Sequence, residues 1–177
     1  MKLKTYRQRI VIKYAAYILL LTVLFLFQTS PFRSIRLLNV TPELILPAVL
    51  LVAMYDGERV GAICAIFAGL IYDANSAIVG FNTVFFIIAA YLTGILISTQ
   101  IKRNVISAII ICSICVFFLN LITYIAFIGL RGEWHLLYVL KSIILPKTIY
   151  TFFVSAALYF VFYFIKMYLF AEETDIS

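Results

Sequence analysis

Six runs without a charged residue set the strongest limit on what this chain can fold into. A helix needs about 20 mostly apolar residues to cross the ~30 Å hydrocarbon core of a bilayer. The 177 residues are 65% apolar and 12% charged, whereas soluble domains are about 25% charged. The runs cover 14–32, 44–55, 60–72, 74–101, 104–130 and 148–165. The sequence therefore predicts an all-α integral membrane protein, with six transmembrane helices in a single domain over 1–177.

Short flanks between these runs carry the positive charge, and Lys and Arg in such flanks favour the cytoplasmic side. With both termini cytoplasmic, six crossings place nine basic residues inside and five outside. We therefore expect a basic cytoplasmic tail at 1–13 and an acidic one at 171–177. Both tails are too short for a folded domain, so no soluble catalytic module is expected. The net charge of +6 then indicates membrane orientation and not nucleic-acid binding.

Proline and glycine mark where the predicted helices begin and end. Thr41 followed by Pro42 is typical of a helix start, and Gly57 suits the left-handed end of a helix that turns back as a hairpin. Pro146 is expected to restart the last helix, with Lys147 snorkelling from its outer end. The expected helices cover 14–27, 42–55, 58–72, a fourth that begins at 80–82, 105–130 and a last from 146. Because the second is short, either its flanks snorkel or the crossing begins near Ile35.

Two neighbouring predicted helices each carry a stripe of small residues at i+4 spacing, on one face. Such stripes let membrane helices approach closely, so these helices should form the centre of the bundle. Asn120 in the fifth helix is polar and should face protein instead of lipid. The stripes are Gly61, Ala65 and Gly69, then Ala90, Gly94 and Ser98.

Asp73 is the only carboxylate between Val60 and Ile101. It could be a catalyst, an ion or proton carrier, a ligand handle or a polar clamp between helices. A catalytic dyad needs two carboxylates that share a site, and Asp56 lies about 25 Å away along the same helix. Glu43 is expected at a similar depth to Asp73.

Arg33 and Arg36 are predicted on the same side of the membrane as Asp73 and Glu43, so an ion-pair cluster is at least as good an interpretation as an acid dyad. The chain has one histidine and none of the serine-hydrolase, zinc-protease or phosphate-loop motifs. We expect no enzyme activity, no cofactor and no metal site. Binding, of protein partners or of a small ligand, is the remaining class.

The stretch from Thr41 to Leu96 resembles the rod shape-determining protein MreD family. A proline opens the second helix, glycines flank a short turn, a Gly-Leu-x-x-Asp closes the third helix, and a Gly followed by an Asn opens a fourth that ends in Tyr-x-x-Gly. The positions that carry the resemblance are Pro42, Gly57, Gly61, Gly69, Leu70, Asp73, Gly80, Asn82, Tyr91 and Gly94.

The resemblance implies a non-enzymatic component of the bacterial cell-elongation (rod-shape) complex, in the cytoplasmic (inner) membrane. It implies partners of three kinds: an MreC-like bitopic protein, an MreB-like cytoskeletal filament, and a RodA-type glycosyltransferase with its transpeptidase, besides membrane lipid. It also implies a fold similar to the substrate-binding subunits of energy-coupling-factor vitamin transporters. Such a vitamin-binding subunit is the alternative function, since Asn75, Asn82, Trp134 and His135 could line a ligand site.

We therefore predict a set of structural and partner-interface residues. In this hypothesis Asp73, with Arg33, Arg36 or Glu43, orders the outer ends of the second to fourth helices, and the surface fixed in this way docks a partner's transmembrane or juxtamembrane segment. The basic tail would contact cytoplasmic partners and anionic lipid. The predicted residues are Asp73, Glu43, Arg33, Arg36, Gly61, Ala65, Gly69, Gly80, Asn82, Tyr91 and Gly94.

Overall fold

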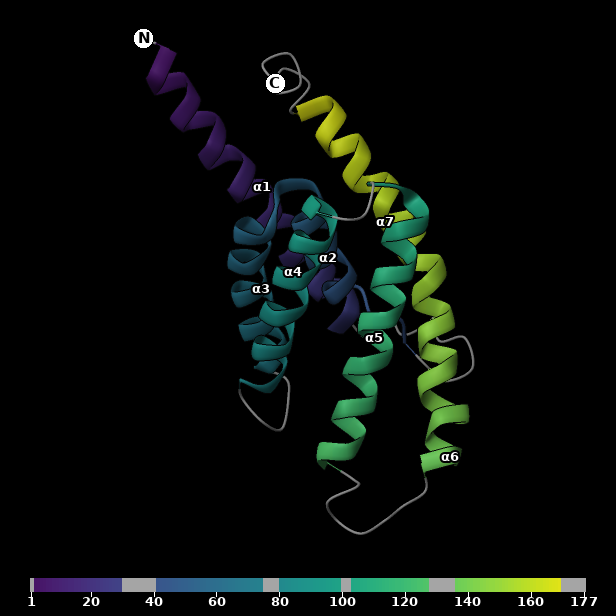
Figure 1. Ribbon diagram of the computed structural model, residues 1–177. Helices are drawn as coiled ribbons and strands as arrows, with labels where there is room; N and C mark the ends of the chain where they lie inside the picture. The colour runs from purple at the N-terminus through teal and green to yellow at the C-terminus, as the bar shows by residue number, and fades with distance from the viewer. Residues whose placement is uncertain (1, 30–40, 75–79, 100–102, 128–135, 170–177) are drawn as a thin grey trace.

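A computed structural model describes residues 2–29, 41–74, 80–99, 103–127 and 136–169, with side chains over 13–29, 41–74, 80–99, 103–126 and 137–165. These residues are helical apart from short connections, and no strand occurs among them (Figure 1). The elements are α1 (Lys2–Thr29), α2 (Ile45–Asp56), α3 (Glu58–Asp73), α4 (Phe81–Thr99), α5 (Val105–Phe127), α6 (Leu136–Val139), the π-helical η3 (Leu140–Ile144) and α7 (Leu145–Leu169).

Three of the described helical segments are long and apolar enough to cross a membrane: Phe81–Thr99, Val105–Ala126 and Leu137–Ile165. Two shorter apolar helices, Lys13–Thr29 and Ile45–Asp56, accompany them. The predicted all-α class and the presence of membrane-spanning helices are thereby confirmed.

The core of the fold is α2, which packs against α1, α3, α4, α5 and α7. All eleven residues from Ile45 to Tyr55 are buried. A helix that is apolar on every side is typical of a protein core or of a membrane span, and α2 has no polar position between Ile45 and Met54. The polar groups at its two ends are therefore held at fixed places inside the bundle.

The hairpin between α2 and α3 turns at Gly57, as the sequence predicts. Gly57 has a φ of 91° and a ψ of 174°, a backbone region that is essentially restricted to glycine. A Cβ added at Gly61 would lie 2.4 Å from the Cβ of Ala53, so α2 and α3 approach to a distance that only glycine permits.

The predicted close packing of α3 and α4 is also confirmed. A Cβ at Gly69 would lie 2.5 Å from the Cα of Thr83, and one at Gly94 would lie 2.4 Å from the Cα of Glu58. Ala65, which lies between Gly61 and Gly69 on the α3 stripe, is fully buried. The α3 stripe is therefore a contact surface, as are Ala90 and Gly94 of the α4 stripe. Ser98, the third predicted member of the α4 stripe, is exposed.

Two expected helix starts are wrong. α1 begins at Lys2 and not at Tyr14, because the basic segment contains no Gly or Pro and is rich in good helix formers. α2 begins at Ile45, so Thr41 and Pro42 precede the helix. The first turn of α2 has no need of a local cap because side chains from other helices satisfy its backbone N–H groups. α5 ends at Phe127, and the expected continuation to Leu130 lies outside the described residues.

The last helix does not restart at Pro146. α6, η3 and α7 follow one another without a break from Leu136 to Leu169, and Pro146 lies within them. The N–H of Leu145 donates to the carbonyl of Leu140, five residues back. Proline disrupts the normal helical hydrogen bond and clashes with the carbonyl four residues earlier, and a wider π turn accommodates such an irregularity.

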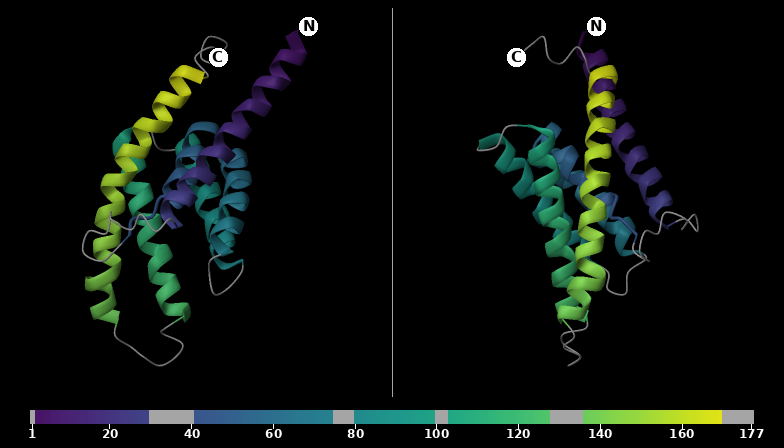
Figure 2. Two further views of the ribbon diagram at one scale, coloured as in Figure 1. Left: turned by 180° about the vertical axis from the view of Figure 1, so that it is seen from behind. Right: turned by 90° about the vertical axis from the view of Figure 1, so that its right-hand side faces the viewer.

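The two halves of the bundle differ in length at the end opposite the chain termini. α3 and α4 end there together, whereas α5 and α6 continue past them, as Figures 1 and 2 show from three sides. The start of α1 and the end of α7 lie at the other end of the bundle.

Candidate functional site

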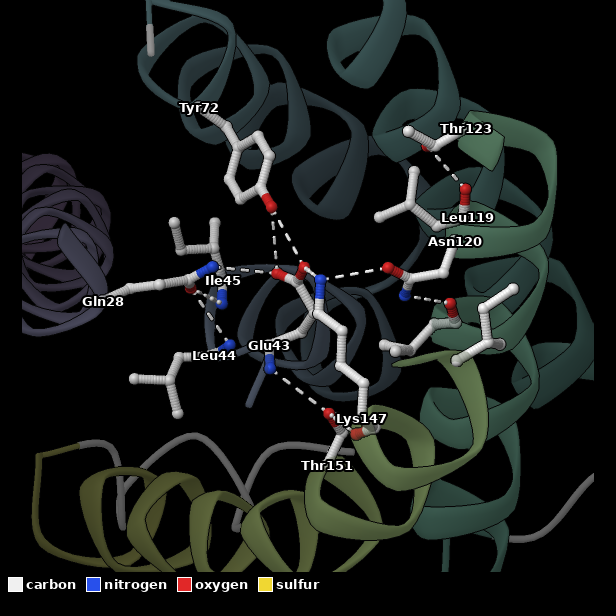
Figure 3. A network of polar contacts seen from close by, with 12 residues as sticks. Gln28, Glu43, Leu44, Ile45, Tyr72, Leu119, Asn120, Thr123, Lys147 and Thr151 are labelled. Atoms are coloured by element: carbon white, nitrogen blue, oxygen red, sulfur yellow. Dashed lines mark hydrogen bonds and ion pairs between the residues drawn. The ribbon is translucent and has the colours of Figure 1, made fainter. Parts of the chain in front are cut away.

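Glu43 is the centre of a buried polar network at the start of α2. Its exposed fraction is 1%, and its carboxylate forms an ion pair with Lys147 of α7. Gln28 of α1 donates to the same carboxylate through Nε2 at 2.9 Å, and the Tyr72 hydroxyl of α3 donates to its two oxygens at 3.0 and 3.2 Å. Figure 3 shows these side chains converging on Glu43. One carboxylate therefore connects α1, α3 and α7.

Lys147 extends the network to a fifth helix. Its Nζ donates to Oδ1 of Asn120 in α5 at 3.0 Å, and Nδ2 of Asn120 donates to the carbonyl of Val116 at 2.7 Å. Asn120 thus faces protein, as the sequence predicts. We call the set Gln28, Glu43, Tyr72, Asn120, Lys147 and Thr151 the Glu43 network.

The same network caps the first turn of α2. The N–H groups of Leu44 and Ile45 donate to Oε1 of Gln28 at 3.1 and 3.4 Å. The N–H of Glu43 donates to Oγ1 of Thr151 at 3.2 Å. These groups are among those that an α-helix leaves without intrahelical partners. The negative charge of Glu43 also lies at the positive end of the α2 dipole, which is favourable.

Lys147 contradicts the expectation that it snorkels from the outer end of its helix. Its ammonium group points into the bundle, towards a carboxylate that is itself buried. A buried carboxylate is very costly without a counter-charge and hydrogen bonds, so the pairing with Glu43 outweighs the tendency of a lysine to reach water.

Asp73 makes a separate set of contacts, with the start of α4. Its Oδ1 accepts from the N–H and Nδ2 of Asn82 at 3.1 and 2.9 Å. Its Oδ2 accepts from the N–H of Gly80 at 2.9 Å and from the N–H and hydroxyl of Thr83 at 3.0 and 2.5 Å. Asp73 is 1% exposed. It therefore caps α4 from the end of α3 and closes this helix hairpin.

Gly80 makes that cap possible, because its φ of 96° lies in the left-handed region that side chains other than glycine rarely adopt. The backbone N–H groups of Gly80, Asn82 and Thr83 thereby all donate to one carboxylate. Among the described residues, the contacts of Asp73 are with Gly80, Asn82 and Thr83, whereas those of Glu43 are with the Glu43 network.

The other predicted residues fall in three places. Arg33 and Arg36 lie outside the described residues, so their ion pairs stay a prediction. Asn75, Trp134 and His135 also lie outside them, and the ligand site predicted from these residues stays a prediction. Gly61, Ala65, Gly69 and Gly94 lie in helix contacts. Tyr91 is an exposed residue on α4.

A second ion pair lies at the opposite end of α2, where Nζ of Lys13 in α1 is 2.7 Å from Oδ1 of Asp56. Carboxylates near a helix C-terminus face the negative end of its dipole, and Lys13 offsets this charge. The central helix therefore has a buried or half-buried ion pair at each end, both with lysines from other helices.

These contacts hold helices together, and they occupy the carboxylates of Glu43 and Asp73, which would otherwise be candidates for acid–base chemistry. All oxygens of Glu43 and Asp73 already accept hydrogen bonds or pair with a cation. Within the residues that the structure describes, no three His, Cys, Asp or Glu side chains gather as a metal site would require. The geometry is that of a polar scaffold inside an apolar bundle.

A family model of the rod shape-determining protein MreD matches residues 8–169. The chain belongs to the MreD family. No curated protein and no solved structure gives a significant match of its own. Membership in the MreD family implies a part in determining rod shape, as a structural membrane protein and in the company of protein partners. Both polar sets described above, around Glu43 and around Asp73, lie inside the matched range.

Proposed function

We propose that this chain is a non-enzymatic scaffold of the bacterial cell-elongation complex, which links an MreC-like bitopic protein, an MreB-like filament and a RodA-type glycosyltransferase with its transpeptidase. The observation that supports this most directly is the use of the buried carboxylates. In a family of shape-determining proteins, Glu43 and Asp73 are fully engaged in joining helices, which makes the bundle rigid and leaves neither of these two carboxylates free for catalysis.

The proposed topology has six crossings, namely α1, α2, α3, α4, α5 and the continuous α6–η3–α7, with both termini in the cytoplasm and the protein in the inner membrane. The start of α1 and the end of α7 lie at the same end of the bundle (Figure 1), which supports an even number of crossings. The basic residues between 2 and 13, at the start of α1, would then lie on the cytoplasmic side, where anionic lipid attracts each by about 1 kcal/mol.

The surface that we propose for docking a partner's transmembrane segment is the outward face of α3 and α4. It is rigid because Asp73 caps α4 and because the glycine contacts lock the two helices together. Large side chains stand exposed along it: Ile63, Ile66, Leu70, Val84, Ile88, Tyr91, Leu92 and Leu96. In a membrane such a face is open to acyl chains or to another apolar helix.

Depletion of the protein in its native host tests the proposal. Rod-shaped cells should become round, and re-expression should restore their shape. Cells that keep their shape while losing vitamin uptake would overturn the scaffold and favour a substrate-binding subunit of a vitamin transporter.

A further inference from the structure

One aromatic contact fixes the first and last helices at a common height. The rings of Tyr17 in α1 and Phe162 in α7 are stacked, with centroids 6.2 Å apart, and both side chains are buried. From this contact each helix continues towards the end of the bundle where α1 starts and α7 ends (Figures 1 and 2). α7 has seven more residues, to Leu169, and seven residues back along α1 lead to Ile10. Ile10 and Leu169 are therefore at about the same height, ~10 Å beyond the ring contact.

The segments that continue past this height carry opposite charges. The start of α1 has four basic residues within eight positions, and no acidic residue precedes Glu43. The residues that follow α7 have three acidic residues within four positions, and no basic residue follows Lys166. We call residues 2–9 the basic segment and residues 172–175 the acidic segment. Their charged residues are Lys2, Lys4, Arg7 and Arg9 in the basic segment, and Glu172, Glu173 and Asp175 in the acidic segment.

The acidic segment is long enough to reach the basic segment. Glu172 follows Leu169 by three residues and Asp175 follows it by six, which allows spans of up to about 10 and 20 Å. The basic segment starts one residue past Ile10 in the same direction and ends at Lys2, about 12 Å past Ile10. The spans of the acidic residues therefore cover the heights of the whole basic segment, with length left to cross from one helix to the other.

The other described charges at this end of the bundle are paired or dispersed. Lys13, the next cation along α1, forms its ion pair with Asp56 at 2.7 Å. Arg59 and Arg103 are exposed, but they belong to different segments of the chain. A short tether gives the acidic segment a millimolar effective concentration at nearby sites. The basic segment offers it four cations at once, so several ion pairs can form together there.

We propose that the acidic segment docks on the basic segment and competes there with anionic lipid headgroups. The inference rests on the membrane topology proposed above, because it needs both segments on one side of the bilayer. Anionic lipid attracts basic residues that lie near the membrane surface, and the acidic segment supplies carboxylates to the same residues. The acidic segment thereby regulates how much of the basic segment is available to the membrane.

Two threonines allow a reporter in each segment without any change of charge. Thr5 lies within the basic segment and Thr174 within the acidic segment. The full-length variant Thr5→Cys, Thr174→Cys is reconstituted at low density in phosphatidylcholine vesicles, and the rate of intramolecular disulfide formation is measured with copper phenanthroline. The matched control is Asn104→Cys, Thr174→Cys, because Asn104 is exposed and lies beside other cations at the same end. In all variants alanine replaces the native cysteines, Cys64, Cys112 and Cys115.

Neutralising the acidic segment should slow disulfide formation between positions 5 and 174 by about threefold or more, since each exposed ion pair contributes a small attraction. The change is made with Glu172→Gln, Glu173→Gln and Asp175→Asn. The rate between positions 104 and 174 should change far less. Vesicles with equal parts of phosphatidylcholine and phosphatidylglycerol should also slow the reaction at position 5, because the anionic headgroups occupy the basic segment.

Three results would overturn the inference. Equal rates at position 5 with the charged and the neutral acidic segment would show that no docking occurs. A rate that depends on the acidic segment at position 104 and not at position 5 would place the docking site at the start of α5. A rate at position 5 that phosphatidylglycerol leaves unchanged would refute the competition with lipid.

Single-cysteine variants separate this inference from the proposed topology. Thr5→Cys and Thr174→Cys chains are treated with a membrane-impermeant maleimide, in intact spheroplasts and in inverted membrane vesicles. Both positions should react in the inverted vesicles alone, as two cytoplasmic termini require. Reaction from opposite sides would overturn the topology together with the inference. Reaction from the same side, with equal disulfide rates for charged and neutral acidic segments, would overturn the docking and leave the topology and the scaffold function in place.

Discussion

Replacing Lys147 with methionine should destabilise the folded chain by about 3 kcal/mol. Methionine preserves most of the side-chain volume but removes the charge that faces Glu43 and the donor to Asn120. Loss of one partner of a buried ion pair costs about 3–5 kcal/mol, since the other charge is left unpaired. The lower end of this range is expected because Gln28 and Tyr72 still donate to Glu43.

The assay is reversible unfolding in detergent micelles by increasing sodium dodecyl sulfate, followed by circular dichroism. Lys141→Met is the matched control, because Lys141 lies on the same helix but is exposed, and its loss should change the free energy of unfolding by less than about 0.5 kcal/mol. The double variant Glu43→Gln, Lys147→Met should be more stable than Lys147→Met alone, with a coupling of about 2 kcal/mol. Equal effects of Lys147→Met and Lys141→Met, or no coupling, would refute the reasoning.

Three further substitutions test the turns and the helix contacts by the same unfolding measurement. Asp73→Asn should cost about 1–3 kcal/mol, because every group around Asp73 is a donor and an amide would turn its own donor towards one of them; wild-type stability in this variant would contradict that contact set. Gly69→Ala should cost about 1–3 kcal/mol by overpacking against the backbone of Thr83, whereas Leu70→Ala, at an exposed position beside it, should cost far less; a smaller effect at Gly69 would mean that α3 and α4 are not in close contact. Gly57→Ala should cost about 1–3 kcal/mol through its backbone alone, because a Cβ there would meet nothing within 4 Å, and an unchanged free energy of unfolding would argue against the positive φ.

Local signals in the sequence were sufficient for the turns and for the close helix contacts. Gly57 between two apolar runs predicts a tight hairpin, and Gly61 and Gly69 at helical spacing predict a face without bulk. Asp73 followed by Gly80 and Asn82 predicts a polar junction between two helices, because all of its contacts lie within ten residues. The turns, the small-residue faces and the Asp73 cap all depend on residues close together in the chain, and a single sequence shows such residues directly.

The Glu43 network could not be predicted in the same way. The hydrogen bond from Glu43 to Thr151 joins residues 108 positions apart, and nothing local distinguishes Lys147 from a lysine at the end of a membrane helix. Gln28 and Tyr72 are single polar groups at the ends of apolar runs and carry no signal of their partners. A charge balance of the interior offers one clue, since a buried Glu43 needs a cation at the same depth.

The prediction that the last helix restarts at Pro146 was wrong for a related reason. A proline after an apolar run usually marks a helix end, but the π turn of η3 immediately before it allows the last helix to continue. The sequence cannot show this because the continuation depends on packing of α7 against α5 and α2. That packing also brings Lys147, the next residue, to face Glu43.

Cell shape under depletion is the most direct test of the central claim, that this MreD-family chain acts in rod-shape determination as a scaffold fastened by the Glu43–Lys147 pair. The native host is depleted of the protein while it expresses wild-type, Lys141→Met or Lys147→Met chains, and cell width and length are measured at equal growth rate. Rods are predicted with wild-type and Lys141→Met chains, and round cells with Lys147→Met or no chain. Rod shape without any chain would contradict the function, and full rescue by Lys147→Met would contradict the scaffold.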